Sequence, residues 1–178
     1  AKPIYNYFDP EWHPYYKDTD LHTIQSVSKS VTSALIGIAI ERGEINGLNE
    51  KIAQYFPNHS SQFIDPLKSK ITIEDLLTMT AGIKWDESSD AYTNPMNNAA
   101  SMENSNNWID YILNLPMEYK PGEKFVYNSG ITVLLSHILH KVSGMHANEY
   151  AEKYLFNKLG IQDYFWKTTP KNLTDAEG

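Results

Sequence analysis

The feature that most constrains the fold is a long apolar run of helical period that begins beside a serine and a lysine. Between residues 26 and 40, apolar residues recur every three or four positions, which places them on one side of an α-helix. A helix with such a stripe packs into the core, and we predict a central helix that ends near Gly43. The residues expected in the buried stripe are Val27, Val31, Ala34, Leu35 and Ile38.

Other segments also carry helix signals. Thr72 and Asp75 fit a capping box that opens a helix, and Gly82 follows where a C-cap glycine is expected. Further helices are predicted at residues 108–115, where Pro116 ends the pattern, at 131–142 up to Gly144, and at 146–159 up to Gly160.

The remaining stretches predict little regular structure. A short strand is expected near residues 4–8 and a short extended piece at 125–127, after a turn at 121–123. Residues 84–107 form a long polar stretch rich in Asn and Ser, which is either a loose surface loop or a substrate-shaping one. No internal repeat or domain boundary is evident, so we expect one mostly helical piece.

Composition excludes several classes of function. A net charge of −7 and an isoelectric point near 5.3 argue against nucleic-acid binding. The absence of cysteine excludes disulfides, thiol catalysis and Cys-ligated metals, and no apolar run has the length of a membrane span. Because the chain begins with Ala1 and stops at Gly178 in a polar stretch, we expect it to be a piece of a longer protein.

Ser26 and Lys29 are the first candidate catalytic residues. Residues three apart on a helix share a face, so the Ser26 hydroxyl and the Lys29 amine can meet. A serine hydroxyl becomes an effective nucleophile when a base takes its proton, and a lysine among apolar walls can serve as that base. With fourteen serines and fourteen lysines in 178 residues, one such spacing is expected by chance, so the prediction depends on its position at the start of the central helix.

Tyr127 is the second candidate, at the entry to the helix predicted from Ile131. A phenol placed near a lysine ammonium favours phenolate and can carry a proton between the serine and a leaving group. The alternative is a core tyrosine with a hydrogen-bonded hydroxyl. Asn128 and Ser129 fit either substrate binding or helix capping.

Taken together, these segments resemble the serine β-lactamase and penicillin-binding protein superfamily, on its class C-like branch. That branch also holds family VIII esterases, D-amino-acid peptidases and amide hydrolases that act on short oligomers. The resemblance covers almost all of the chain from about residue 21. The segments that carry it, in the order of the family, are residues 25–33, 76–83, 121–130 and 155–161.

The resemblance implies an α+β fold of the β-lactamase/transpeptidase type, with a helical region and an antiparallel sheet. It implies that Ser26 is the acylated nucleophile, that Lys29 is its proton acceptor or electrostatic partner, and that Tyr127 is the general base and acid. The backbone N–H of Ser26 would form half of the oxyanion hole. No cofactor and no metal is implied.

The chain departs from the family pattern in two places. The third residue of the family's Tyr-x-Asn motif, which helps to hold the substrate amide, is Ser129 here, and Asn128 stands one place earlier. The Lys-Thr-Gly or His-x-Gly strand is also missing, since residues 167–169 are followed by Pro170 and lack a strand pattern. We therefore expect residues 1–178 to be the N-terminal part of one domain. The rest, with most of the sheet, would follow residue 178 or be a separate chain, and the piece alone would be inactive.

Other functions remain open from the sequence. A Ser-His-Asp hydrolase is the nearest enzymatic alternative, but this sequence contains no Gly-x-Ser-x-Gly elbow. His22 also lies too close to Ser26 in sequence to be a persuasive partner. A metal site at His137 and His140 lacks a supporting motif, and helix-surface histidines are the favoured alternative.

Within the superfamily, an esterase or amidase for small esters or peptide-like amides is favoured. The alternatives are a true β-lactamase or penicillin-binding D,D-peptidase, and, from another class, a non-catalytic penicillin- or ligand-binding sensor domain. The resemblance slightly favours an extracytoplasmic location, which the residues themselves do not decide.

Overall fold

The computed structural model describes residues 24–166, and this part of the chain is mostly helical, as predicted. Its β-structure is limited to two isolated antiparallel bridges, Lys51–Thr72 and Ile83–Met117. The predicted strand near residues 4–8 lies outside the described residues. The α-helices are α1 (Ser28–Glu41), α2 (Ile73–Leu77), α3 (Asn98–Glu103), α4 (Trp108–Asn114), α5 (Ser129–Ser143), α6 (Ala147–Ala151) and α7 (Asn157–Leu159). Short 3₁₀ turns are η2 (Gln25–Val27), η3 (Ile52–Tyr55), η4 (Pro57–His59), η5 (Gln62–Ile64) and η6 (Lys68–Lys70), and η7 (Glu152–Phe156) is π-helical.

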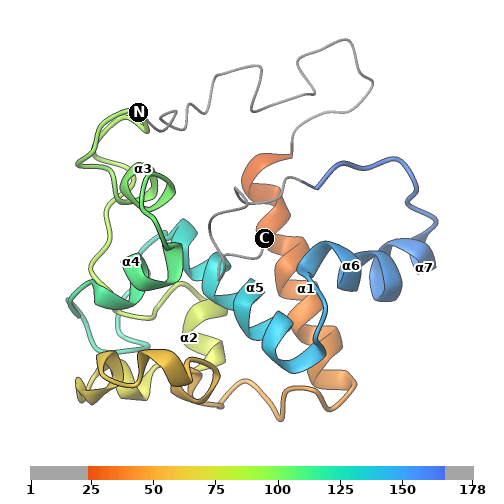
Figure 1. Cartoon of the computed structure of the whole chain (residues 1–178), viewed down its shortest axis with the longest axis horizontal. Helices are drawn as coiled ribbons and strands as arrows, with labels where there is room; N and C mark the ends of the chain where they lie inside the picture. The colour runs from red at the N-terminus through yellow and green to blue at the C-terminus, as the bar shows by residue number, and fades with distance from the viewer. Residues whose placement is uncertain (1–23, 167–178) are drawn as a thin grey trace.

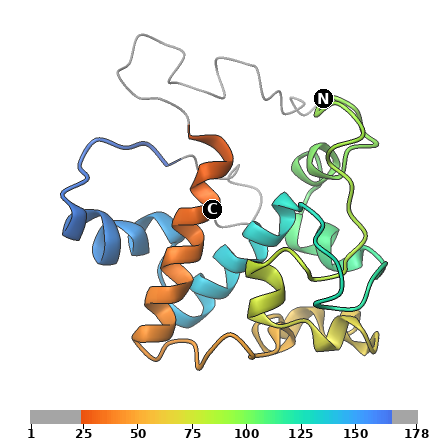
Figure 2. The same ribbon diagram turned by 180° about the vertical axis from the view of Figure 1, so that it is seen from behind.

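Helices α1 and α5 pack against each other in the middle of the molecule (Figure 1). Helices α3 and α4 lie on one side of this pair, and α6 and α7 lie on the other, as the view from behind also shows (Figure 2). Buried apolar residues from α1, α2, α4, α5 and α6 form one core. None of the helices between residues 24 and 166 combines the length and apolarity needed to cross a membrane.

The central helix is confirmed as α1, but the predicted buried stripe is only partly correct, because Leu35 is fully buried whereas other members of the stripe are not. Val27 is 64% exposed and Ala34 is also exposed, while Val31 and Ile38 are half-buried. Apolar residues occur on most sides of this helix, so its periodicity alone does not fix which face is buried. Packing against α5 and α6 selected the face that contains Thr32, Leu35, Ile36 and Ala39.

The two C-terminal helical predictions are confirmed with one refinement. Helix α5 ends at Gly144, which adopts the left-handed conformation with a φ of 70°. The segment predicted as one helix over residues 146–159 is continuous through α6, η7 and α7, and Gly160 ends it with a φ of 71°. Its middle turn is π-helical, which the apolar spacing did not predict.

The capping box at Thr72 is confirmed, because its hydroxyl accepts the Asp75 N–H while Asp75 accepts the Thr72 N–H. The assignment of Gly82 as the C-cap is wrong, since α2 ends at Leu77 with Thr78 as its C-cap. Gly82 has a φ of 77°, and an added Cβ there would lie 2.3 Å from the carbonyl oxygen of Tyr119. This glycine therefore permits close contact between two chain segments.

Residues 84–107 were predicted as a long loop, but they contain α3. The side chain of Asn97 caps α3 by accepting the N–H groups of Ala99 and Ala100. Its amide group donates to the carbonyl oxygens of Glu87 and Asp90, at 3.0 and 2.9 Å. The segment that precedes α3 is thus folded around a buried asparagine.

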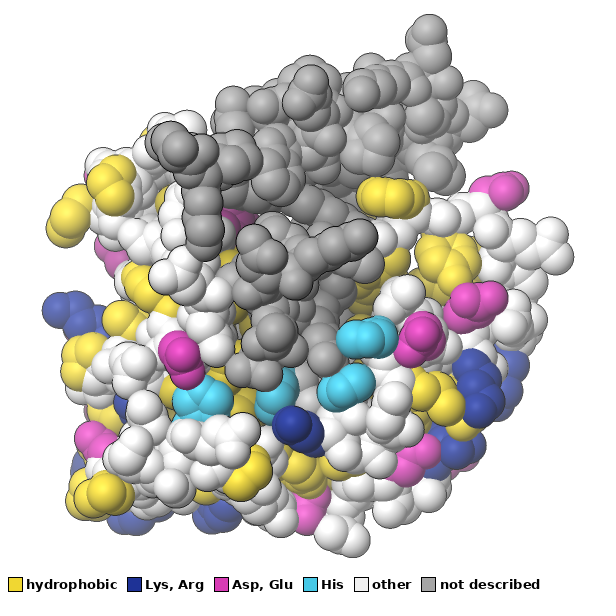
Figure 3. Space-filling view, viewed as in Figure 1, with side chains coloured by type: hydrophobic (Ala, Val, Ile, Leu, Met, Phe, Trp, Pro, Cys, Tyr) yellow, Lys and Arg dark blue, Asp and Glu magenta, His cyan; other side chains and the backbone are white. Residues whose placement is uncertain are grey.

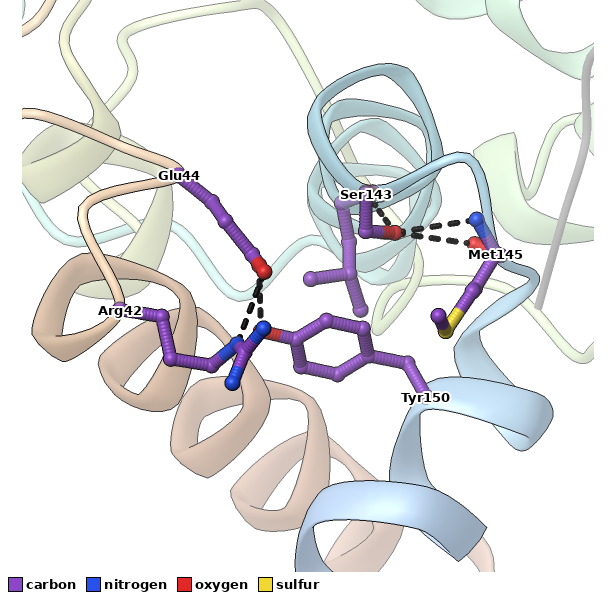
Figure 4. Close-up of polar contacts among 6 residues, drawn as sticks. Arg42, Glu44, Ser143, Met145 and Tyr150 are labelled. Carbon is purple, nitrogen blue, oxygen red and sulfur yellow. Dashed lines mark hydrogen bonds and ion pairs between the residues drawn. The ribbon is translucent and has the colours of Figure 1, made fainter.

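The C-terminal end of α1 is tied to α6 by a polar cluster (Figure 4). Glu44 accepts a 2.6 Å hydrogen bond from the Tyr150 hydroxyl and a 2.8 Å bond from Nε of Arg42. Burial and the nearby Glu44 carboxylate raise the pKa of Tyr150. Close by, the Ser143 hydroxyl accepts the Met145 N–H and fixes the turn between α5 and α6. The cluster thus anchors the C-terminal end of α1, whereas Ser26 lies next to its N-terminal end.

Candidate active site

Ser26 lies in the 3₁₀ turn η2, immediately before α1, and its side chain is exposed. The turn is closed by a 2.9 Å bond from Val27 N–H to the carbonyl oxygen of Ile24 and by a 2.7 Å bond from the Ser28 hydroxyl to that of Gln25. Gln25 has a φ of 42°, which is uncommon for a residue other than glycine. The backbone thus bends sharply just before Ser26.

The structure brings the three predicted catalytic side chains together. Lys29 Nζ lies 3.2 Å from Ser26 Oγ and donates a hydrogen bond to it. The Tyr127 hydroxyl donates to the same oxygen at 2.6 Å. Lys29 Nζ also lies 5.2 Å from the centroid of the Tyr127 ring. Ser26 Oγ is therefore contacted by two groups that can each exchange a proton with it.

Tyr127 is positioned by pairing between two segments far apart in sequence. The N–H of Val126 donates to the carbonyl oxygen of Met79 at 2.9 Å, and Gly122 N–H donates to that of Thr80 at the same distance. Just upstream, the carbonyl oxygen of Gly82 accepts the Glu118 N–H at 2.8 Å. The chain between α2 and residue 84 therefore holds the segment that leads into Tyr127.

Asn128 takes the helix-cap role rather than the substrate-binding role given first in the sequence prediction. Its side chain is 1% exposed, and its oxygen accepts the Ile131 N–H at 3.2 Å. The next residue but one, Gly130, leaves no room for a side chain, because an added Cβ there would lie 2.9 Å from Ile112 and 3.0 Å from Trp85. A substrate contact by Asn128 does not fit this burial.

Ser129 directs its polar groups to a residue that sequence reasoning missed. Its N–H and hydroxyl donate to the two carboxylate oxygens of Glu87, at 2.8 and 2.9 Å. Glu87 also accepts bonds from Trp85 Nε1 at 2.7 Å and from the Tyr92 hydroxyl at 3.2 Å. It stands in an irregular polar stretch, where no spacing marks it as a partner of residue 129. The one sequence feature that could have drawn attention to Glu87 is its position directly after Trp85 and Asp86.

The same loop contains a second organised carboxylate, Asp86. Its oxygen accepts the N–H groups of Ser88 and Ser89, each at 3.0 Å. Hydrogen bonding from the Ser89 side chain, then from these two N–H groups, lowers the pKa of Asp86 to about 2. The turn at residues 86–89 is therefore built for an ionised carboxylate.

The histidines predicted as a possible metal pair have other environments. The ring of His137 is buried and stacks on Phe56 with centroids 4.8 Å apart, and His140 stacks on His146 at 4.9 Å. Histidine side chains gather near the middle of one face (Figure 3). Among residues 24–166 no cluster of three or more metal-ligating side chains occurs. The expectation of surface histidines is wrong for His137, because packing with Phe56 covers it.

Comparison with known proteins decides the family. The model of the beta-lactamase family matches residues 10–177. The chain belongs to the beta-lactamase family. The resemblance inferred from the ordered motifs is thereby confirmed, and solved structures with a similar fold include penicillin-binding proteins, a class C β-lactamase and a protein described as a putative 6-aminohexanoate-dimer hydrolase.

Several known proteins are similar to this chain. A protein of Escherichia coli K12 named "Putative D-alanyl-D-alanine carboxypeptidase" is 29% identical over 116 residues, which cover 64% of this chain and 26% of that protein. The penicillin-binding protein homologue of Pyrococcus abyssi is 26% identical with a TM-score of 0.60, over 80% of this chain and 32% of that one.

The class C beta-lactamase of Rhodobacter sphaeroides is 22% identical with a TM-score of 0.53, over 86% of this chain and 42% of that one, and this likeness concerns the fold alone. The β-lactamase/transpeptidase-like fold therefore fits this beta-lactamase family member. The chain spans about a quarter of the length of the Escherichia coli relative. His22 and residues 167–169, weighed in the sequence prediction, lie outside the described residues.

Proposed function

We propose that the whole protein is a serine hydrolase that cleaves an ester or amide bond through an acyl-Ser26 intermediate. The single observation that carries this proposal is the contact of Ser26 Oγ with both Tyr127, at 2.6 Å, and Lys29, at 3.2 Å. Membership of the beta-lactamase family supports the same class of reaction.

In the proposed acylation, Ser26 Oγ attacks the substrate carbonyl carbon and its proton passes to the Lys29–Tyr127 pair. One member of the pair must be deprotonated before the attack so that it can accept this proton. The bond to the leaving group then breaks, and the pair returns the proton to the leaving oxygen or nitrogen. Water next attacks the acyl carbon, and Ser26 regains its proton as the acid product leaves.

We further propose that residues 1–178 are the N-terminal part of a single α+β domain. This proposal is supported by the small share of the relatives' length that the chain spans. In the proposal, a sheet strand in the remainder supplies the second oxyanion donor. In this proposal the remainder is either joined to this chain or a separate partner chain. Small esters and peptide-like amides are the proposed substrates rather than β-lactams, because Ser129 bonds to Glu87 and no asparagine amide stands at that position.

The test is covalent labelling of the full-length protein with a fluorophosphonate, followed by mapping of the labelled residue. We expect label on Ser26, turnover of a p-nitrophenyl ester, and loss of both in Ser26→Ala. Ser30→Ala is the matched control, since Ser30 is an exposed serine in the first turn of α1, four residues after Ser26. Absence of label on Ser26 overturns the proposal, whereas label without turnover indicates the non-catalytic sensor function.

A D,D-peptidase is the second candidate, favoured by the name of the Escherichia coli relative. Release of D-alanine from a peptide that ends in D-alanyl-D-alanine separates it from an esterase. Hydrolysis of a chromogenic cephalosporin separates a true β-lactamase from both.

A further inference from the structure

Glu87 is a buried carboxylate that takes no part in the proposed proton transfers. Its side chain is 3% exposed, and its oxygens accept bonds from Trp85 Nε1, the Tyr92 hydroxyl and both donors of Ser129. No cation forms a salt bridge with Glu87 in the described part of the chain. A buried charge is tolerated when hydrogen bonds replace its hydration, and here four donors do so.

The position of Glu87 connects it with Tyr127. Ser129 is the first residue of α5, two residues after Tyr127, and its N–H is one of the groups that an α-helix leaves without an internal partner. Glu87 accepts this N–H at 2.8 Å, while Asn128 accepts the N–H of Ile131. A negative charge at this end of a helix is also stabilised by the helix dipole. The first turn of α5 is therefore fixed by two acceptors, and Tyr127 directly precedes it.

The other side of Glu87 is equally fixed. Asn97 donates to its carbonyl oxygen, and the Trp85 ring is buried against the start of α5, where Gly130 lets it approach. The carboxylate thus joins a rigid loop to the start of α5. A displacement of either would be transmitted to the Tyr127 phenol, whose bond to Ser26 is short.

We propose that Glu87 is a positioning residue for Tyr127, acting through Ser129 at the start of α5. The inference rests on the proposed function, in which Tyr127 exchanges a proton with Ser26. The hydrogen bonds of the Glu87 carboxylate go to Trp85, Tyr92 and Ser129 rather than to Ser26 or Tyr127, so its effect is on the geometry of the phenol.

Glu87→Gln tests this in the full-length protein, because glutamine has nearly the same shape but lacks the charge and one of the two acceptor oxygens. We expect kcat for ester hydrolysis to fall by about 10- to 100-fold with little change in KM, as is typical when a reacting group is misplaced. Glu44→Gln is the matched control, since Glu44 also accepts bonds from a tyrosine hydroxyl and another donor, but between α1 and α6. It should lower Tm with kcat unchanged.

A second readout separates positioning from general loss of stability and requires no activity. The ¹³Cζ NMR signal of Tyr127, assigned with Tyr127→Phe, reports its hydrogen bond to Ser26 and should shift in Glu87→Gln but not in Glu44→Gln. Ser129→Ala, which removes one donor to Glu87 and leaves the N–H, should give a smaller change of the same kind. It also keeps the test available if Glu87→Gln does not fold.

The outcomes separate this inference from the proposed function. An unchanged kcat and an unchanged Tyr127 signal in Glu87→Gln, in a protein whose Ser26 is labelled, overturn the role of Glu87 alone. Without label on Ser26, the proposed function fails, and the Tyr127 signal still decides whether Glu87 sets its position. Equal losses of kcat in Glu87→Gln and Glu44→Gln would indicate a purely structural role and would also overturn the inference.

Discussion

The hydroxyl of Tyr127 donates a 2.6 Å hydrogen bond to Oγ of Ser26, a residue 101 positions earlier in the chain. The nucleophile and Lys29 belong to one short segment around the start of α1, whereas the phenol arrives from the start of α5. The proposed chemistry therefore depends on how precisely two helices are placed relative to each other.

Tyr127→Phe removes one oxygen from this contact and leaves the ring. We expect the rate of Ser26 acylation to fall by about 100- to 10,000-fold, as for loss of a general acid or base. Because the side chain is 38% exposed, Tm should change little. Stopped-flow acylation with a p-nitrophenyl ester measures the rate. Tyr119→Phe, which loses a hydroxyl bonded to Lys124, serves as the control and should keep the wild-type rate.

Gly82→Ala should destabilise the protein strongly. The left-handed backbone costs an added Cβ about 1–2 kcal/mol, and overlap with the Tyr119 carbonyl, 2.3 Å away, adds about 1–3 kcal/mol. Gly144→Ala is the control, since Gly144 has a similar φ with open space around it and should show the backbone cost alone. Urea unfolding measures both. Equal losses in the two variants would contradict a role for close packing at Gly82.

Lys68→Met tests a buried ammonium group. Lys68 is 5% exposed, burial lowers its pKa, and its Nζ donates to the carbonyl oxygens of Leu113 and Leu115 at 2.6 and 2.7 Å. Lys68→Met leaves these two carbonyl oxygens, at the C-terminal end of α4, without their charged donor. The free energy of unfolding should therefore fall by about 2 kcal/mol. Lys70 is exposed, so the control Lys70→Met should leave the free energy of unfolding almost unchanged. Similar unfolding midpoints for the two variants would show that the Lys68 contacts contribute little.

The turn held by Asp86 should depend on pH only in acid. Its pKa is lowered to about 2, so the unfolded turn binds a proton more readily than the folded one. The contribution of Asp86 is complete above the ordinary aspartate pKa of about 4 and is lost as pH falls through about 2. Carboxyl ¹³C titration, with amide hydrogen exchange at Ser88 and Ser89, measures this. Asp86→Asn should abolish the dependence, and a midpoint near 4 would contradict the assigned hydrogen bonds.

Local signals in the sequence predicted much of this molecule. The capping pair at Thr72 and Asp75 and the glycine that ends α5 depend on neighbouring residues, so the sequence alone identifies them. Helical spacing links only Ser26 and Lys29, and the residues around Tyr127 also allow a core tyrosine, so the choice of Tyr127 as their catalytic partner depends on the resemblance to a family.

Features set by distant contacts were missed or wrong. The buried face of α1 was chosen by packing with α5 and α6, which its own periodicity does not encode. Glu87 meets Ser129 from 42 positions away, in a stretch that carries no period. Gly82 was assigned to a helix end because its neighbour at Tyr119 is not visible in the local pattern.

The pairing of residues 82–84 with 116–119 closes the base of a chain excursion that includes α3 and α4. Insertions or deletions between α3 and α4 leave the register of the two closing segments unchanged. The position of Tyr127, which follows the second closing segment, is then also unchanged. Residues 104–106, between α3 and α4, are therefore where we expect related sequences to gain or lose residues. Residues 117–127 should tolerate no such change. The fold thus separates a part whose length can vary from a part whose length is fixed by the position of one phenol.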